Sequence, residues 1–368
     1  MRVLFLEPYP TEGPSSRYRV EQYIPYLRQN GIECEVRPFV SSAFYKILYK
    51  KGIYLRKLAY FTAGAIRRIA DLFAAFSSDV VFIHLEAFPF GPPAIEWLLA
   101  VTGKKIIYDL DDAIYLGSAS STNSFLKGLK CPWKIPKIIA MSRCVITCNE
   151  YLAEYASKYN KEVTVIHTSV DTEKFKPLGQ SRGRPEGQPS GSRITIGWIG
   201  SHSTAKYLVS LKGVFEELVK RGLKFRLKII GASGRIMEVP GAEVIYKDWS
   251  LKDEIAEFQS IDIGVYPLTD DEWTAGKTGF KTIQYMSVGI PCVASNASPN
   301  RVIIEEGRNG FLAKDTAEWV EKLSKLMGDA GLRQRIGEAG RRTVLERYSL
   351  EVNAPKIMGM IRKTAGKR

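Results

Sequence analysis

The stretch G-K-T-G-F-K-T-I-Q-Y-M-S-V-G-I-P-C-V-A-S runs from Gly276 to Ser295 and decides the fold class. A glycine-containing loop opens a short amphipathic helix, Gly289 ends that helix, and an apolar strand follows. The loop brings backbone N–H groups, the positive end of the helix and the charges of Lys277 and Lys281 to one place. Such a loop suits a phosphorylated ligand, so the stretch predicts an α/β unit that binds phosphate.

The alternation of helix and strand continues on both sides of this stretch. In the second half of the chain we expect strands at Ile194–Ile199, Phe225–Ile230, Val244–Tyr246 and Ile261–Tyr266, and helices at Thr204–Arg221, Leu251–Gln259, Thr316–Met327, Leu332–Glu346 and Val352–Lys363. In the first half we expect strands at Val3–Leu6, Val80–Leu85, Lys105–Tyr108, Cys144–Thr147 and Val163–His167, and helices at Arg17–Asn30, Ala94–Val101 and Glu150–Tyr159. Continuous apolar strands that alternate with helices indicate parallel sheets covered on both faces.

A segment rich in Gly, Pro and Ser divides the two patterns and reads as a linker. We therefore expect a Rossmann-like domain over residues 1–177, a linker over 178–193, a second Rossmann-like domain over 194–350, and a C-terminal helix over 351–368 that packs back on the first domain. Ligands of open α/β sheets bind at the carboxyl ends of strands, so we expect a cleft between the domains.

Composition limits the class of protein. The chain has 368 residues, 45% apolar and 25% charged, as is typical of globular domains. Five cysteines without a CxxC pair indicate reduced thiols, and three widely separated histidines argue against a histidine-rich metal site. Two of them, His84 and His167, end apolar strands and are interpreted as structural. We find neither a secretory signal nor a spanning segment, which favours the cytosol.

The net charge of +14 is unevenly spread along the chain. Residues 41–70 hold seven basic side chains and no acidic one: Lys46, Lys50, Lys51, Arg56, Lys57, Arg67 and Arg68. Aromatic and aliphatic residues lie between them, as in a helix that lies on an anionic membrane surface. The alternative is an ordinary helical hairpin whose basic face is solvated and whose apolar side lies in the core. Nucleic acid is not predicted as a partner, because no nucleic-acid-binding motif accompanies the charge.

Several motifs, taken in order and spacing, resemble those of one enzyme family. They are S-S-R-Y-R-V (15–20), Y-D-L-D-D-A (108–113), H-T-S-V-D-T (167–172), I-G-W-I-G-S-H-S-T-A-K-Y-L (196–208), I-I-G-A-S-G (229–234), D-I-G-V-Y-P-L (262–268), the opening stretch and G-R-N-G-F-L-A (307–313). The chain resembles the family 4 retaining glycosyltransferases of the GT-B fold, also called group 1 glycosyltransferases. This resemblance covers nearly all of the chain.

The resemblance implies transfer of a sugar from a nucleoside diphosphate donor to an acceptor hydroxyl, with retention and without a metal ion or other cofactor. The C-terminal domain is expected to bind the donor through Gly200, Ser201, His202, Lys206, Gly231, Lys277, Thr278, Gly279, Phe280, Lys281 and Gln284. Lys206 is the candidate that neutralises the leaving diphosphate; the alternative is an exposed helical lysine. His202 is expected to contact the diphosphate as well; the alternative is a histidine in a surface loop.

One departure from the family pattern concerns the donor sugar. Many relatives carry two glutamates eight residues apart in the opening motif, where this chain has Gly276 and Gln284. Gln284 can still bond a ribose hydroxyl. Either backbone amides of residues 278–281 hold a neutral sugar, or Lys277 and Lys281 favour an acidic sugar or the phosphates.

The first domain is expected to bind the acceptor. Asp109 and Asp111 follow a buried strand, where carboxylates can orient or deprotonate an acceptor hydroxyl. Helix capping is the alternative, and a Mg²⁺ site is discounted. Arg17 and Arg19, after the first strand, are candidate acceptor or phosphate contacts. In this class the donor phosphate is often proposed as the base.

These features together predict a cytoplasmic glycosyltransferase at the membrane surface with a lipid-linked or surface-polysaccharide acceptor. Two alternatives stay open. One is a GT-B nucleotide-sugar epimerase, which needs a carboxylate pair in the donor site. The other is a non-catalytic protein that binds nucleotide-sugars or membranes, suggested by the two missing glutamates.

Overall fold

The computed structural model describes residues 1–50, 52–117, 129–178, 193–232 and 234–366, and it divides into two α/β units. The first unit comprises Met1–Ser169, Gly276–Thr278 and Leu350–Arg368, and the second comprises Val170–Ala275 and Gly279–Ser349. The second unit thus begins earlier along the chain than residue 177, the expected end of the first domain. The predicted linker at 178–193 lies outside the described residues, except at its two ends.

The first unit is built on a six-stranded parallel sheet with the order β2-β1-β3-β4-β5-β6. Its strands are β1 (Arg2–Glu7), β2 (Glu33–Pro38), β3 (Val80–His84), β4 (Ile106–Leu110), β5 (Cys144–Thr147) and β6 (Val163–Val165). Every residue of β3, β4 and β5 is buried, as expected for strands covered on both faces. The strand order reverses between β1 and β3, which makes the carboxyl ends of these strands the expected ligand position.

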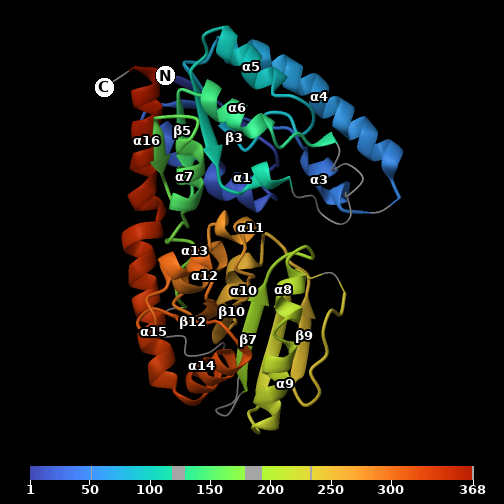
Figure 1. Ribbon diagram of the computed structural model, residues 1–368, viewed down its shortest axis with the longest axis vertical. Coiled ribbons are helices and arrows are strands. Elements are labelled where there is room, and N and C mark those ends of the chain that lie inside the picture. Colours follow the sequence, from blue (N-terminus) through green and yellow to red (C-terminus); the bar gives the residue numbers. More distant parts are fainter. Residues whose placement is uncertain (51, 118–128, 179–192, 233, 367–368) are drawn as a thin grey trace. The chain divides into compact units, whose positions relative to one another are not determined.

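Helices on both sides of this sheet are shown in Figure 1. They are α1 (Pro14–Arg19), α2 (Ile24–Gln29), α3 (Ser42–Leu48), α4 (Tyr54–Phe76), α5 (Ala94–Val101), α6 (Lys134–Met141), α7 (Glu150–Ser157) and α16 (Leu350–Ala365). The single helix predicted at Arg17–Asn30 is wrong. A 3₁₀ turn, Glu21–Tyr23, separates α1 from α2, where Pro25 has no N–H to continue the helical ladder.

The C-terminal helix α16 contributes to the core of the first unit. Its residues Ala354, Ile357 and Ile361 are buried in the same cluster as Val3 and Phe5 of β1. Lys105, just before β4, also donates from Nζ to the carbonyl of Ala365 at 3.0 Å. Helix α16 therefore packs on the sheet to which β1 belongs.

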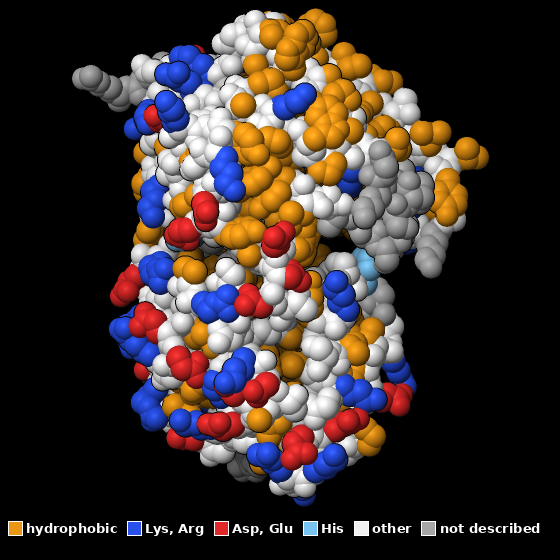
Figure 2. All heavy atoms as spheres, viewed as in Figure 1, with side chains coloured by type: hydrophobic (Ala, Val, Ile, Leu, Met, Phe, Trp, Pro, Cys, Tyr) orange, Lys and Arg blue, Asp and Glu red, His pale blue; other side chains and the backbone are white. Residues whose placement is uncertain are grey.

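Helix α4 buries one ion pair, Arg68 with Asp71, and exposes a line of apolar side chains. The buried Arg68 donates to Asp71 Oδ2 at 3.1 Å and to the carbonyl of Glu7 at 3.1 Å. A stripe of apolar residues along the helix is exposed instead: Leu55, Leu58, Ile66, Ile69, Phe73 and Phe76. Trp97, Leu98 and Val101 of α5 are exposed as well, and hydrophobic side chains gather over both helices in Figure 2. We call these nine residues the α4–α5 apolar face.

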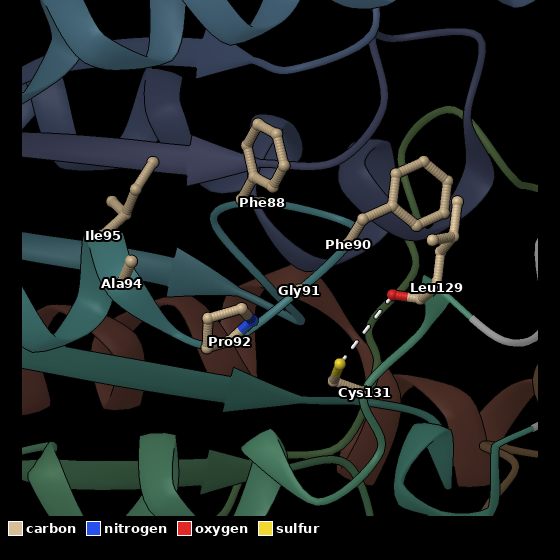
Figure 3. A pocket seen from close by; sticks show the side chains of 8 residues that line it. All are labelled: Phe88, Phe90, Gly91, Pro92, Ala94, Ile95, Leu129 and Cys131. Carbon is tan, nitrogen blue, oxygen red and sulfur yellow. Dashed lines mark hydrogen bonds between the residues drawn. The ribbon is translucent and has the colours of Figure 1, made fainter.

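An apolar pocket of about 600 Å³ lies beside the start of α5. Its lining is Phe88, Phe90, Gly91, Pro92, Ala94, Ile95, Leu129 and Cys131 (Figure 3). Phe61 of α4 packs against two of these residues, with ring centroids 5.6 Å from Phe88 and 5.3 Å from Phe90. The pocket therefore adjoins α4 and α5. Within the described residues, no helix combines the length and the apolar character needed to cross a membrane.

The second unit holds another six-stranded parallel sheet, with the order β12-β11-β10-β7-β8-β9. Its elements are β7 (Ile194–Ile199), α8 (Ala205–Val209), α9 (Lys212–Lys220), β8 (Phe225–Ile230), β9 (Glu243–Lys247), α10 (Glu254–Gln259), β10 (Ile263–Tyr266), α11 (Glu272–Ala275), α12 (Phe280–Ser287), β11 (Cys292–Ser295), α13 (Ser298–Ile303), β12 (Phe311–Ala313), α14 (Thr316–Gly328) and α15 (Ala330–Thr343). Two parallel sheets confirm the predicted fold class.

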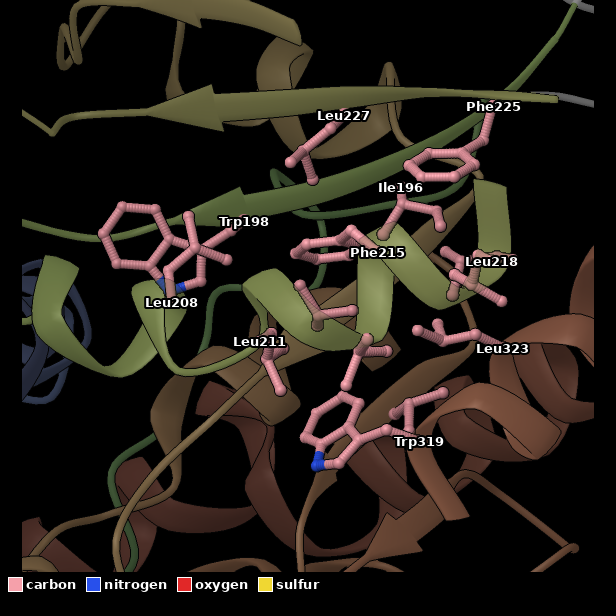
Figure 4. Packing of buried hydrophobic residues seen from close by; sticks show 14 of the residues in the cluster. Ile196, Trp198, Leu208, Leu211, Phe215, Leu218, Phe225, Leu227, Trp319 and Leu323 are labelled. Atoms are coloured by element: carbon pink, nitrogen blue, oxygen red, sulfur yellow. The ribbon is translucent and has the colours of Figure 1, made fainter. Parts of the chain in front are cut away.

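The core of the second unit lies between β7, β8, α9 and α14. Phe215 and Leu218 of α9 face Ile196 and Leu227 of the sheet, and Trp319 of α14 closes the cluster (Figure 4). The uninterrupted helix predicted at Thr204–Arg221 is wrong, because the chain leaves helical geometry between α8 and α9. There the Ser210 hydroxyl donates to the carbonyl of Tyr207 at 2.7 Å, a local bond that competes with the helical ladder.

Candidate active site

A chain of buried and half-buried polar side chains lies at the carboxyl ends of β3 and β4, beside α1. His84 is the last residue of β3, Asp109 lies within β4, and Asp111 follows β4. Ser15 and Arg19 come from α1, which follows β1. The strand order reverses between β1 and β3, so the fold itself brings these five residues together at the switch point. We call them the switch-point network.

Arg19 and Asp109 form the buried base of this network. Their side chains are 1% and 0% exposed. The guanidinium donates to both carboxylate oxygens, from Nε to Oδ2 at 3.1 Å and from Nη2 to Oδ1. Arg19 Nη1 also donates to the carbonyl of Ile166 at 2.7 Å. Burial alone would raise the pKa of Asp109, but Arg19 and His84 together hold it below its usual value. Asp109 is therefore an ionised, fully bonded carboxylate.

His84, Ser15 and Asp111 continue the network. His84 Nδ1 lies 2.7 Å from Asp109 Oδ2, and its Nε2 lies 2.7 Å from Ser15 Oγ. The Ser15 hydroxyl donates to Asp111 Oδ2 at 2.7 Å. Asp111 Oδ1 accepts no hydrogen bond from the described residues, although it is buried. His84 Nε2 lies 3.8 Å from this oxygen, beyond hydrogen-bond distance.

Gly276, which stands where many relatives carry the first glutamate, and its neighbour Lys277 belong to the first unit. Asn149 Nδ2 donates to the carbonyl of Lys277 at 2.9 Å, and Lys277 Nζ lies 3.8 Å from Asp112 Oδ2. A Cβ on Gly276 would lie 2.5 Å from the Cβ of Ala113. A glutamate side chain at position 276 therefore has no room beside Ala113, and Lys277 has a carboxylate nearby.

In the second unit, glycines end two adjacent strands. Gly200 follows β7, and a Cβ there would lie 2.2 Å from the ring of Trp198. Gly231 follows β8 with φ +85°, and its Cβ would lie 2.1 Å from the carbonyl oxygen of Gly200. The strand order reverses between β7 and β10, so Gly200 and the following Ser201 lie at the switch point of this sheet. A ligand can approach the backbone closely where side chains are absent.

Lys206 and His202 lie near this glycine turn. Lys206 is exposed on α8, with Nζ 5.0 Å from the ring centroid of Tyr207. His202 is half-buried in the loop between β7 and α8. Ser201 N donates to Thr204 Oγ1 at 3.0 Å, which shapes this loop. An exposed lysine beside a side-chain-free strand end is available to an anionic ligand.

Helix α12 begins at the other predicted donor residues. Gly279 caps it with φ +64°, and Phe280 is its first residue. Lys281 Nζ donates to Gln284 Oε1 at 2.8 Å, so two expected ligands contact each other, and Gln284 is fully buried. Thr278 groups with Lys277 in the first unit.

Arg17 is separate from the network. It lies on the outer side of α1, where Nη1 donates to the carbonyl of Thr11 at 3.2 Å. Among the described residues, no group of three His, Cys, Asp or Glu side chains is arranged to hold a metal ion.

Sequence reasoning did not select Ser15, His84 or Asn149 as site residues. Each follows or ends a strand on the sheet edge where Asp109 and Asp111 lie, and that shared position was the available signal. A lone histidine at a strand end is more often structural, and only the three-dimensional contact with Ser15 distinguishes this one.

Comparisons with known proteins show which family the second unit resembles. Residues 193–329, from β7 to α14, match the family described as "Glycosyl transferases group 1". The capsular polysaccharide biosynthesis glycosyltransferase CapM of Staphylococcus aureus is 22% identical over 169 residues, which are 43% of this chain and 43% of CapM. The chain thus matches less than half the length of that curated relative.

Two solved structures are similar over nearly the whole chain. A glycosyltransferase from Rickettsia africae has a TM-score of 0.69 at 16% identity and covers 99% of this chain and 98% of its own. HepE from Anabaena, in complex with UDP-glucose, has a TM-score of 0.66 at 13% identity and covers 99% and 100%. Residues 193–329 thus match the group 1 glycosyltransferases, and the architecture of both sheets is that of the GT-B fold.

Proposed function

We propose that this protein transfers a sugar from a nucleoside diphosphate donor to an acceptor hydroxyl, with retention and without a metal ion, in the synthesis of a cell-surface polysaccharide or glycolipid. The observation that carries this proposal is the pair of side-chain-free strand ends, Gly200 and Gly231, inside the residues that match the glycosyltransferase family. Two similar proteins support the chemistry: HepE is solved with UDP-glucose, and CapM is a glycosyltransferase of capsular polysaccharide biosynthesis.

The second unit binds the donor in this proposal. Backbone N–H groups near Gly200 and Ser201 and the N-terminal end of α12 stabilise the diphosphate, whose negative charge grows as the sugar leaves. Lys206 adds a positive charge beside them. Lys277 and Lys281 already contact Asp112 and Gln284, which favours a neutral sugar over an acidic one. Faster turnover of uronic-acid donors than of neutral ones would contradict this preference.

Lys206→Ala is expected to lower kcat about 10²- to 10³-fold, since it removes a cation that stabilises the leaving diphosphate. The matched control is Lys212→Ala on α9, a half-exposed lysine whose nearest carboxylate, on Glu216, is 3.8 Å away. Steady-state release of nucleoside diphosphate from UDP-glucose measures both variants. Equal rates for the two variants would contradict the role of Lys206.

The first unit binds the acceptor, with Asp111 as the carboxylate that receives the hydroxyl proton. Asp109 and Arg19 have a supporting role in this proposal, since their hydrogen-bonding groups are used within the network. Asp111 Oδ1, which accepts no hydrogen bond from the described residues and lies 3.8 Å from His84 Nε2, bonds the acceptor hydroxyl in this proposal.

The α4–α5 apolar face docks on an anionic membrane surface in the second part of this proposal. Arg56 and Lys57 are on the same helix as the exposed stripe, with Arg67 further along, and the acidic residues of α4 and α5, Asp71 and Glu96, are both buried. The helix leaves its line of leucine, isoleucine and phenylalanine side chains in contact with water. Contact with lipid removes that apolar surface from water, and the basic residues meet the headgroups.

Substitution of Ile66, Ile69 and Phe73 by Gln is expected to weaken binding to phosphatidylglycerol vesicles at least about tenfold, because each apolar side chain contributes 1.5 kcal/mol or more when buried. The three residues are 63%, 58% and 74% exposed, so their replacement leaves the core intact. The control replaces Val302 and Leu345 of the second unit, which are 45% and 42% exposed. Co-sedimentation that is unaffected by the triple substitution, or by added salt, would contradict the docking face.

The pocket beside α5 suits the hydrocarbon chain of a lipid-linked acceptor. It is lined mainly by Phe, Pro, Ala, Ile and Leu and adjoins the helices of the proposed membrane face. Ala94→Trp fills this space from α5, and we expect it to raise KM for a long-chain acceptor while leaving KM for a short-chain analogue unchanged. An equal effect on both acceptors would contradict this assignment.

The two alternatives make different predictions. An epimerase needs a carboxylate pair at the donor, and position 276 has no room for a carboxylate side chain beside Ala113. A non-catalytic binding protein would bind nucleoside diphosphates but release none from a nucleotide-sugar. Assays of sugar transfer, donor hydrolysis and epimerisation with a panel of nucleotide-sugars distinguish all three.

A further inference from the structure

We propose that Asn149 is a positioning residue for the donor nucleotide: its side-chain amide orients the peptide unit between Lys277 and Thr278, whose N–H then meets the diphosphate. This inference rests on the proposed glycosyl transfer and names a residue that prepares its donor side. It is carried by the hydrogen bond from Asn149 Nδ2 to the carbonyl of Lys277 at 2.9 Å, together with the unbonded N–H group of Thr278.

Asn149 uses both ends of its side-chain amide. It is the N-cap of α7, where Oδ1 accepts from the N–H of Leu152 at 2.9 Å. The other end, Nδ2, donates to the carbonyl of Lys277. These two contacts fix the orientation of the amide, because the reversed amide would bring two N–H groups together at Leu152 and two oxygens together at Lys277. The residue that caps α7 is therefore also an anchor for residue 277.

Several other contacts of the first unit hold residues 276 and 277. A Cβ on Gly276 would lie 2.5 Å from the Cβ of Ala113, so the backbone packs directly against the loop after β4. Cys148 Sγ, after the neighbouring strand β5, lies 3.9 Å from the carbonyl oxygen of Gly276. Lys277 Nζ lies 3.8 Å from Asp112 Oδ2. The bond from Asn149 thus belongs to a segment that is packed on the carboxyl ends of two adjacent strands.

The anchored carbonyl fixes the direction of the next N–H group. A trans peptide unit is planar, so its C=O and its N–H point in opposite directions. Because Asn149 holds the carbonyl of Lys277, the N–H of Thr278 points away from Asn149. Among the described residues, neither this N–H nor that of Gly279 donates a hydrogen bond. Two successive backbone donors are therefore available to a ligand.

These two donors lead into the N-terminus of α12. Gly279 is the N-cap of this helix, whose first N–H groups have no partner within the helix. The position of Gly279 is fixed by α13, since a Cβ there would lie 2.4 Å from Ile303 Cδ1. Successive N–H groups at the positive end of a helix suit the oxygens of a phosphate. Only Thr278 lies between the two fixed points, so the direction of its N–H depends on Asn149.

The alternative is that Asn149 only caps α7, and its two functions can be separated chemically. Asp and Ser are as good as Asn at an N-cap, because each offers an oxygen to the helix. Neither replaces the amide donor: the carboxylate of Asp has no N–H, and the side chain of Ser is one atom shorter. Ala loses both functions.

The binding test compares Asn149→Asp, Asn149→Ser and Asn149→Ala by calorimetric titration with UDP, ADP, GDP and TDP. We expect all three variants to bind the preferred diphosphate about three- to tenfold more weakly than the wild type, the equivalent of one hydrogen bond. Only Asn149→Ala should lower the urea midpoint, and the neutral Asn149→Ser excludes an effect of added charge. The control, Ser41→Ala, removes the N-cap of α3 in the same unit and should leave binding unchanged. Wild-type affinity in Asn149→Ser would overturn the proposal.

A second readout needs no nucleotide. Trypsin cleaves after lysine, and the peptide bond after Lys277 contains the carbonyl that Asn149 holds. We expect cleavage at this bond, followed by mass spectrometry, to be about three- to tenfold faster in Asn149→Ser and unchanged in Ser41→Ala, because cleavage follows the population of the opened segment. Equal rates in the wild type and Asn149→Ser would overturn the anchor. Faster cleavage in Asn149→Ser, with no diphosphate bound by the wild type, would instead count against the proposed function.

Discussion

Gly231→Ala is expected to lower the free energy of unfolding of the second unit by about 3 kcal/mol and to abolish nucleoside diphosphate binding. Two effects combine at this position. The backbone has φ +85°, which costs an L-residue about 1–2 kcal/mol, and the new Cβ would lie 2.1 Å from the carbonyl oxygen of Gly200. Relief of such a clash by a backbone shift costs a further 1–3 kcal/mol, roughly. The shift also moves Gly200, whose backbone is proposed to meet the diphosphate.

Gly234→Ala is the matched control. It has φ +76° and no atom within 4 Å of the new Cβ, so it carries only the backbone cost. We expect a loss of about 1–2 kcal/mol and intact binding of UDP. Urea unfolding and calorimetric titration with UDP measure both variants. If Gly231→Ala and Gly234→Ala lose the same stability, the close packing of the two strand ends is incorrect.

Arg19→Met is expected to lower the free energy of unfolding of the first unit by about 3–5 kcal/mol at pH 7, because it leaves the charge of Asp109 buried without its partner. The carboxylate is fully buried, so its charge has no contact with solvent in the folded protein. Lys363→Met is the control, since its ion pair with Glu162 is 69% and 55% exposed. An exposed pair of this kind contributes about 0–1 kcal/mol.

The effect of Arg19→Met depends on pH in a defined direction. Arg19 and His84 lower the pKa of Asp109 in the folded protein, against the opposing effect of burial. The ionised carboxylate therefore contributes to stability above the pKa of Asp in the unfolded chain, about 3.9. That contribution is lost as pH falls through the lower, folded pKa. The stability difference between the wild type and Arg19→Met should therefore narrow below about pH 4. A difference that stays constant from pH 7 to pH 3 would contradict an ionised Asp109.

Sequence patterns predicted the sheets better than the helices. Strands such as Cys144–Thr147 and Phe225–Ile230 are apolar runs between clear turns, and the structure confirms both bounds. Strand β2 was missed because its residues E-C-E-V-R-P alternate with charge at the edge of the sheet. The helical spacing of apolar residues continues across the breaks near Pro25 and Ser210, because a local break does not change which residues are apolar. The sequence therefore predicted one helix at each place where the structure has two.

The character of α4 could be predicted only in part. Basic and apolar residues alternate along it, and the sequence left open which side faces the core. The structure buries Arg68 with Asp71, because Arg68 bonds the backbone of β1 and β2 at the carbonyls of Glu7 and Arg37. Such long-range partners leave no periodic signal. The same limit applies to the switch-point network, whose members come from positions 15 to 111.

The departure at Gly276 has a physical reason that only the structure supplies. Position 276 lies too close to Ala113 for a side chain. The packing of the loop therefore requires glycine where many relatives carry a glutamate. Gln284 bonds Lys281 and is buried, which was not evident from its spacing.

The central claim is that this chain transfers sugar from a nucleoside diphosphate donor. The most direct measurement incubates the purified protein and its Lys206→Ala variant with a panel of radiolabelled nucleotide-sugars and a bacterial lipid extract, and follows label entering the lipid fraction. We predict incorporation from at least one neutral donor, with equimolar release of nucleoside diphosphate and a loss in the variant. Binding of nucleoside diphosphates without incorporation or release from any donor would contradict the claim.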